Sequence, residues 1–195
     1  VTGAIPIRRD AKDPAYLVTL KAYIAELLHR HDLLFYPEGG RSYSGEIKSP
    51  KTGLLTACVQ SAQPGLVIVP VSIAYDLVLE DHVLARQKVK RSQRAFSREV
   101  AEMVRYAVGY RSRAFVTFGE PISLEGYQAE SRTSVLELGH VVMQRIGRQI
   151  KVLPTSLMAA ALGPSMSDQE LHDRIAGMLE ALSVSGANLD ATTAP

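Results

Sequence analysis

The sequence has one cysteine, little net charge and no long apolar run. These absences argue against a disulfide-stabilised protein and against a membrane-spanning helix, and they leave the partner unidentified. The single cysteine, Cys58, cannot form an internal disulfide, which fits a reducing compartment. The formal net charge of +2 identifies no charged partner by itself. The longest apolar stretch, residues 66–74, is interrupted by Pro70 and Ser72 and falls short of the roughly 20 residues of a membrane-spanning helix.

What is present is an ordinary globular composition, with 46% apolar residues and enough length for one hydrophobic core. Apolar residues at helical spacing predict helices near residues 14–31, 50–62, 135–150, 156–162 and 167–182. Apolar runs predict strands at residues 3–7, 33–36, 66–76 and 114–118. The pattern therefore predicts one α/β domain over residues 1–182, with a central mixed β-sheet flanked by helices. We expect residues 183–195 to form a frayed tail.

The densest group of functional side chains follows the predicted strand at residues 33–36. A carboxylate, two glycines, a guanidinium and a hydroxyl stand together in the run Glu38, Gly39, Gly40, Arg41 and Ser42. Open α/β sheets bind ligands at the carboxyl ends of their strands. Ser49-Pro50 then predicts a helix start, and free N–H groups around Lys51 in its first turn favour a phosphate site beside Arg41. A polar surface turn is the alternative interpretation.

Three other stretches leave alternatives open. Residues 3–9 end in Arg8 and Arg9, which fit either a solvated strand tip or an anion contact. Pro70 lies inside a strand although proline donates no ladder hydrogen bond, which implies an edge position, a bulge or a functional constraint. Residues 86–98 hold six basic and no acidic residues. They fit either a solvated helix face or a patch that faces anionic headgroups or a nucleotide phosphate, whereas the scarcity of interleaved aromatics argues against nucleic acid.

These stretches, in this order, resemble the glycerol-3-phosphate acyltransferases, in particular the large bacterial membrane-associated type. Residues 3–9 resemble the second block of that family, which ends in two arginines. Residues 36–54 resemble its third block, which binds glycerol phosphate, and residues 69–76 resemble its fourth, including the proline. Residues 118–121 are also similar to the family's strand end, and the resemblance covers most of residues 1–182.

The resemblance implies an enzyme that transfers a fatty acyl group from acyl-CoA or acyl-carrier protein to the 1-hydroxyl of glycerol 3-phosphate. The product, 1-acyl-glycerol 3-phosphate, begins phospholipid synthesis. The implied partners are glycerol 3-phosphate, the acyl donor and a membrane surface, bound peripherally on the cytoplasmic side. The resemblance implies no nucleic acid, no metal and no cofactor besides the acyl donor.

The resemblance also implies a set of substrate-binding residues, namely Arg8, Arg9, Glu38, Gly39, Gly40, Arg41, Ser42, Lys51 and Pro70. Arg9 and Arg41 would hold the phosphate, because a guanidinium fork matches phosphate oxygens better than an ammonium does. Glu38 and Ser42 would hydrogen-bond the glycerol hydroxyls or hold Arg41 in place. Pro70 would shape the acyl-donor side of the site.

The sequence departs from the family pattern in its catalytic block. That block has a histidine, which takes the proton of the attacking hydroxyl, and an aspartate five positions later that orients the ring. None of the five histidines here has an aspartate five positions later. The chain starts at Val1 without a methionine, so we expect a fragment that is inactive alone and whose His-Asp pair lies upstream. Tyr43 also stands where the family usually has an arginine, and Pro6 where the family often has an aromatic residue. The tyrosine at position 43 predicts weaker phosphate affinity or a different substrate.

Other functions stay open at this point. Acyltransferases acting on dihydroxyacetone phosphate or a lysophosphatidate share the same blocks. A non-catalytic module that binds phosphate or anionic lipid would also explain the missing His-Asp pair. A nucleotide-binding P-loop is disfavoured, because Gly45 is followed by Glu46 rather than by the required lysine and hydroxyl residue.

Overall fold

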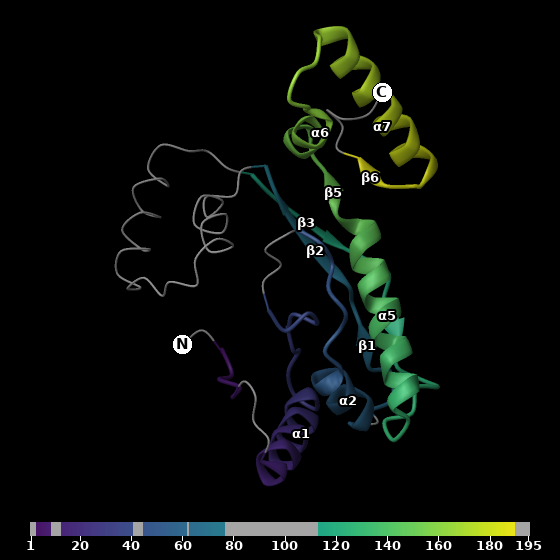
Figure 1. Ribbon diagram of the computed structural model, residues 1–195. Coiled ribbons are helices and arrows are strands. Elements are labelled where there is room, and N and C mark those ends of the chain that lie inside the picture. The colour runs from purple at the N-terminus through teal and green to yellow at the C-terminus, as the bar shows by residue number, and fades with distance from the viewer. Residues whose placement is uncertain (1–2, 9–12, 41–44, 62, 77–112, 190–195) are drawn as a thin grey trace, which may run out of the picture. The chain divides into compact units, whose positions relative to one another are not determined.

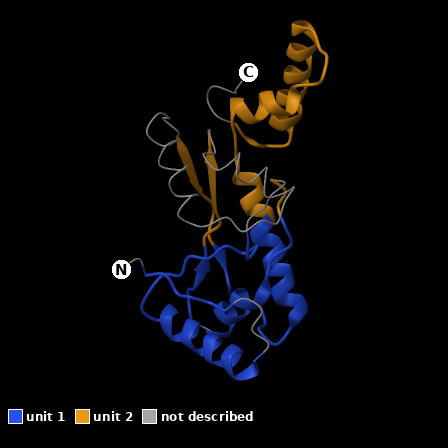
Figure 2. Ribbon diagram, turned by 60° about the vertical axis from the view of Figure 1, so that its left-hand side comes forward, with its two compact units in different colours: residues 1–40, 48–68, 122–143 blue, residues 41–47, 69–121, 144–195 orange. Residues whose placement is uncertain are grey.

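The structure, a computed structural model, describes residues 3–8, 13–40, 45–61, 63–76 and 113–189. The chain divides into two compact units, shown in two colours in Figure 2. Unit 1 comprises residues 1–40, 48–68 and 122–143, and unit 2 comprises residues 41–47, 69–121 and 144–195. The domain boundary expected at residue 182 stays a prediction.

Helices supply most of the core of unit 1. Helix α1 (Pro14–Leu28) begins as the sequence predicts, because the Asp13 carboxylate accepts a hydrogen bond from the Ala15 N–H at 3.0 Å, and it ends short of the predicted His31. Helix α2 (Thr52–Gln60) packs against α1 (Figure 1). Helix α5 (Arg132–Gln149) begins in unit 1 and ends in unit 2. The largest fully buried side chains of these helices are Ile24, Leu55, Val135 and Leu138.

Two short strands replace the single strand predicted at residues 66–76. Strands β1 and β4 pair antiparallel in unit 1, and strands β2 and β3 pair antiparallel in unit 2. Their bounds are Val67–Ile68 for β1, Val71–Tyr75 for β2, Ala114–Phe118 for β3 and Ile122–Ser123 for β4. The predicted strand at residues 114–118 is therefore confirmed.

The registers of the two strand pairs place a one-residue offset in the segment opposite Pro70. Ile68 lies opposite Ile122, and Val71 lies opposite Phe118. Residues 69–70 separate β1 from β2, but residues 119–121 separate β3 from β4, so the extra residue lies in the β3–β4 segment. A one-residue offset of this kind is a β-bulge. Pro70 thus lies opposite the bulged segment, between two strands that each have one partner among the described residues, so the structure fits both the edge position and the bulge offered for it.

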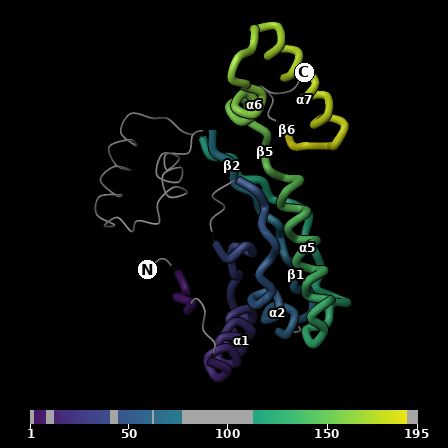
Figure 3. The backbone as a smooth tube through the Cα atoms, viewed as in Figure 1, coloured from purple at the N-terminus to yellow at the C-terminus, as the bar shows by residue number. Residues whose placement is uncertain are grey.

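The rest of unit 2 contains a helical pair and a small parallel sheet. Helix α6 (Pro154–Ala161) contacts helix α7 (Asp168–Val184), as Figure 3 also shows. The predicted capping box of α7 is confirmed, since Ser167 and Glu170 each bond the backbone N–H of the other. Strands β5 (Lys151–Val152) and β6 (Asn188–Leu189) pair in parallel. Residues 183–189 thus finish α7 and add β6, where the sequence predicts a frayed tail.

Two predicted strands are corrected by the structure, and the predicted central sheet is not shown among the described residues. Residues 33–36 are extended but join no ladder among the described residues, with Leu34 80% and Tyr36 74% exposed, and residues 3–7 form no strand either. The described strands make three separate two-stranded sheets rather than one central mixed sheet. A strand is stabilised by its cross-strand partners, and the described chain provides none for these segments. The fold shown is therefore a mixture of helices with small sheets, consistent with the α/β class.

Candidate functional site

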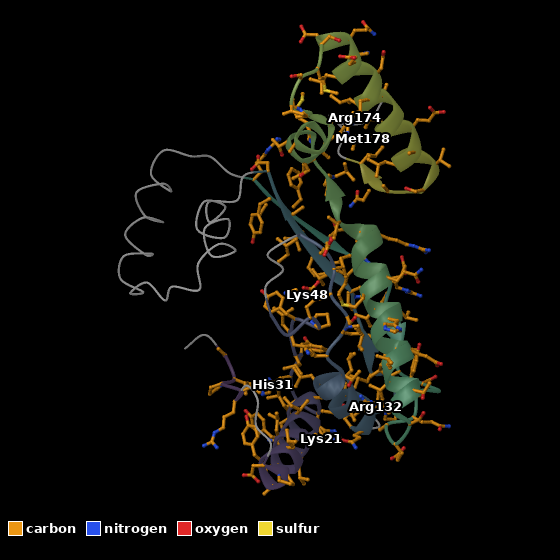
Figure 4. All side chains as sticks on the ribbon, in the orientation of Figure 1. Lys21, His31, Lys48, Arg132, Arg174 and Met178 are labelled. Atoms are coloured by element: carbon orange, nitrogen blue, oxygen red, sulfur yellow. The ribbon has the colours of Figure 1, made fainter. Side chains whose placement is uncertain are left out.

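The glycine loop at residues 37–40 is fastened to the start of α2 by backbone hydrogen bonds within unit 1. The Lys51 N–H donates to the Pro37 carbonyl at 2.7 Å. The Lys48 N–H donates to Oε1 of Glu38 at 3.3 Å, and Figure 4 marks Lys48 on the segment that leads into α2. These bonds join the two ends of the segment between Glu38 and Lys48. The glycine loop and the helix start thus adjoin, and the predicted place of the helix start beside Arg41 stays a prediction because Arg41 lies outside the described residues.

Gly39 is required in this loop for two reasons. Its φ of +66° lies in the left-handed region, which favours glycine. A Cβ added there would also lie 2.9 Å from Cγ of Lys51, so the methylenes of that lysine occupy the space beside Gly39. Gly40 differs, because an added Cβ would meet nothing within 4 Å. Packing against the backbone at Gly39 therefore helps to position the first methylenes of the Lys51 side chain.

Helix α2 begins later than the Ser49-Pro50 pattern predicts. Lys51 is its N-cap, and no side chain hydrogen-bonds to the helix start. Pro50 is instead buried against α5, where a Cβ added at Gly139 would lie 2.8 Å from Cγ of Pro50. Packing in the core thus overrides the local capping signal. Lys51 directly precedes the first turn of α2, whose free N–H groups and positive dipole end favour an anion.

The predicted site residues are only partly brought together. Glu38, Gly39, Gly40 and Lys51 form the loop and helix start described above. Arg9, Arg41 and Ser42 lie outside the described residues, as does the basic stretch at residues 86–98.

Arg8 and Pro70 have separate surroundings. Arg8 belongs to unit 1, where its backbone N–H donates to Oη of Tyr16 at 2.9 Å and its Cζ lies 5.6 Å from the centroid of that ring. Among the described residues, Arg8 makes no hydrogen bond or ion pair with Glu38 or Lys51. Pro70 is buried in unit 2, and its carbonyl accepts a hydrogen bond from the Gly119 N–H at 2.9 Å. The structure thus gives the geometry of the loop and leaves its binding role and the contributions of Arg9 and Arg41 as predictions.

Sequence reasoning missed the residues that support the loop. The backbone groups of Pro37 and Lys48 carry no side-chain signal, because any residue provides them. Gly139 does carry one, since a glycine inside a helical pattern often marks close packing. The described residues contain no cluster of three or more metal-ligating side chains and no helix long and apolar enough to cross a membrane.

Comparison with known proteins adds independent information. An acyltransferase family model matches residues 1–74, and the model of the glycerol-3-phosphate acyltransferase C-terminal region matches residues 99–195. The Mycobacterium tuberculosis protein plsB1, named as an acyltransferase, is 32% identical over 177 residues, which are 83% of this chain and 28% of that protein.

Two further relatives are named as glycerol-3-phosphate acyltransferases. The protein of Pasteurella multocida is 30% identical over 206 residues, covering 91% of this chain and 25% of that protein. The protein of Glaesserella parasuis is 36% identical over 136 residues, covering 64% of this chain and 16% of that protein. The chain thus spans about a quarter of the length of the first curated relatives it matches. No solved structure matches.

Proposed function

Because the chain belongs to the glycerol-3-phosphate acyltransferase family, we propose that it is the substrate-binding part of a glycerol-3-phosphate 1-O-acyltransferase. The observation that carries this proposal is the glycine loop held against the start of α2, with the Lys51 N–H on the Pro37 carbonyl at 2.7 Å. This arrangement offers an anion the first-turn N–H groups of α2 and the Lys51 ammonium together. The phosphate of glycerol 3-phosphate is an anion of the required kind.

The phosphate is the part of the substrate that this chain would hold. Lys51 and the helix start would contribute a point charge and backbone donors, and Arg9 and Arg41 would add bidentate guanidinium contacts. Ser42 would bind a glycerol hydroxyl. One carboxylate oxygen of Glu38 accepts a hydrogen bond from the Lys48 N–H. The main role of Glu38 would therefore be to close the loop that carries Arg41.

The acyl transfer itself requires a base that this sequence does not contain in the family's spacing. We expect a histidine, oriented by an aspartate five positions later, in the remainder of the full-length protein. It would take the proton of the 1-hydroxyl as the oxygen attacks the thioester carbonyl. The C–S bond then breaks, the thiolate of CoA or of the carrier protein leaves, and 1-acyl-glycerol 3-phosphate is formed. Pro70 would border the acyl donor.

Membrane association is a further part of the proposal. The acyl chain of the product partitions into lipid, and the six basic residues between 86 and 98 suit the anionic cytoplasmic leaflet. Docking would therefore be peripheral and cytoplasmic. In the full-length protein the small sheets would join one central mixed sheet flanked by helices.

A non-catalytic module that binds phosphate or anionic lipid is the second candidate. It is favoured by one observation: no histidine of these 195 residues has an aspartate five positions later. Acyltransferases acting on dihydroxyacetone phosphate or a lysophosphatidate remain alternative enzymes, because they would use the same phosphate contacts.

Steady-state acyl transfer by the full-length protein tests the proposal. Arg41→Ala and Lys51→Ala should each raise the KM for glycerol 3-phosphate at least about tenfold, because a charge-assisted hydrogen bond contributes about 1.5–3 kcal/mol. Lys21→Ala, on α1, is the matched control and should leave KM unchanged. Equal KM values for all three variants would contradict the site. Full-length protein without transferase activity would favour the module, and a higher kcat/KM for dihydroxyacetone phosphate would reassign the substrate.

A further inference from the structure

One face of the β2·β3 ribbon in unit 2 is apolar and exposed. Strand pairing places Val71 opposite Phe118, Ile73 opposite Val116 and Tyr75 opposite Ala114. Successive side chains of a strand point to opposite faces, so these pairs share one face. Most of it is open to solvent, with Val116 51% and Phe118 72% exposed. We call this surface the Ile73/Val116 face.

The opposite face of the same ribbon is packed. Ser72 is only 4% exposed, and its hydroxyl donates to the Gln149 carbonyl at 3.0 Å. The Asn188 amide donates to the same carbonyl at 2.9 Å and to Oγ1 of Thr117 at 3.4 Å. The ribbon is thus covered on one side and bare on the other. A near-continuous apolar strand such as residues 66–76 is typical of a sheet covered on both faces.

Monomeric proteins seldom leave several neighbouring large apolar side chains exposed without a partner. A two-stranded ribbon is also marginally stable by itself and needs a second packed layer. The described residues provide a layer on the Ser72 side only. The Ile73/Val116 face therefore lacks the element that its composition requires.

The length of the relatives indicates where that element comes from. This chain spans 28% of the Mycobacterium tuberculosis relative and 25% of the Pasteurella multocida relative. A protein of that length holds several times more polypeptide than is present here. From this we infer that the Ile73/Val116 face is an intramolecular docking surface, covered by an apolar element of the full-length polypeptide outside these 195 residues.

This inference is independent of the acyl-transfer chemistry, and its test uses no activity. In the full-length protein, Val116→Cys should react with a maleimide at least about tenfold more slowly than Glu137→Cys, an exposed control position on α5, because covered sites react only when they open. Peptide mass spectrometry reads each cysteine separately. Phe118→Cys is a second variant on the same face, in case Val116→Cys does not fold.

The covering element is then identified by cross-linking. A photoreactive benzoyl-phenylalanine in place of Val116 should cross-link to a peptide outside these 195 residues. Equal labelling of Val116→Cys, Phe118→Cys and Glu137→Cys would overturn the inference. Cross-links to residues 33–36 or 77–112, or to a second copy in an isotope-mixed sample, would overturn it too. Protection that requires added vesicles would show that lipid covers this face instead.

Discussion

Replacing Gly39 by alanine tests whether the left-handed backbone of the glycine loop supports the candidate site. At a φ of +66°, a residue with a side chain pays about 1–2 kcal/mol relative to glycine. The new methyl group would also lie 2.9 Å from Cγ of Lys51, so that side chain must move. We therefore expect Gly39→Ala to lower the free energy of unfolding by about 1–2 kcal/mol.

Urea unfolding followed by circular dichroism measures this change, with Gly40→Ala as the matched control. A Cβ at Gly40 meets nothing within 4 Å, so its effect should stay within about 0.5 kcal/mol. With an m-value of about 2 kcal/mol/M, Gly39→Ala should lower the urea midpoint by about 0.5–1 M. Equal midpoints for the two variants would refute the reasoning that Gly39 is needed for its conformation.

Three further predictions concern packing and titration. Gly139→Ala should lower the free energy of unfolding by about 1 kcal/mol, because overpacking against Pro50 outweighs the better helix propensity of alanine. Gly177→Ala has open space around it and should raise the free energy of unfolding by about 0.5–1 kcal/mol. Urea unfolding of the two variants compares these effects. Burial raises the pKa of the Cys58 thiol to about 11, so Ellman's reagent at pH 8 should label it only as the chain unfolds, and rapid labelling without denaturant would contradict this. Hydrogen bonds from the backbone and hydroxyl of Ser167, the N-cap of α7, lower the pKa of Glu170. The stabilisation of α7 by Glu170 is therefore present above the unfolded-state pKa and is lost as the pH falls through the folded-state pKa. Glu170→Gln should remove this acid dependence, which amide hydrogen exchange in the first turn of α7 measures.

Local signals in the sequence predicted local structure well. The Asp13 cap of α1 and the capping box of α7 depend on residues within one helical turn, and both are confirmed. The failures depend on distant partners. The Ser49-Pro50 signal gives way because Pro50 packs against Gly139 of α5. Residues 33–36 have the composition of a strand but no partner strand among the described residues.

The candidate site follows the same division. The sequence predicted a helix start beside Arg41, which lies outside the described residues, and the structure joins the neighbouring glycine loop to that helix start. The sequence did not predict what holds them, because the Lys51 N–H and the Pro37 carbonyl are backbone groups that every sequence contains. It also did not predict that Pro70, in unit 2, falls in a different compact unit from the loop.

Calorimetric titration of this chain and of the full-length protein with glycerol 3-phosphate tests the central claim most directly. We predict millimolar or tighter binding that is lost in Arg41→Ala and retained in Lys21→Ala. Binding of equal strength in Arg41→Ala, or no binding to either protein, would contradict the assignment of the glycine loop and the start of α2 as a phosphate site.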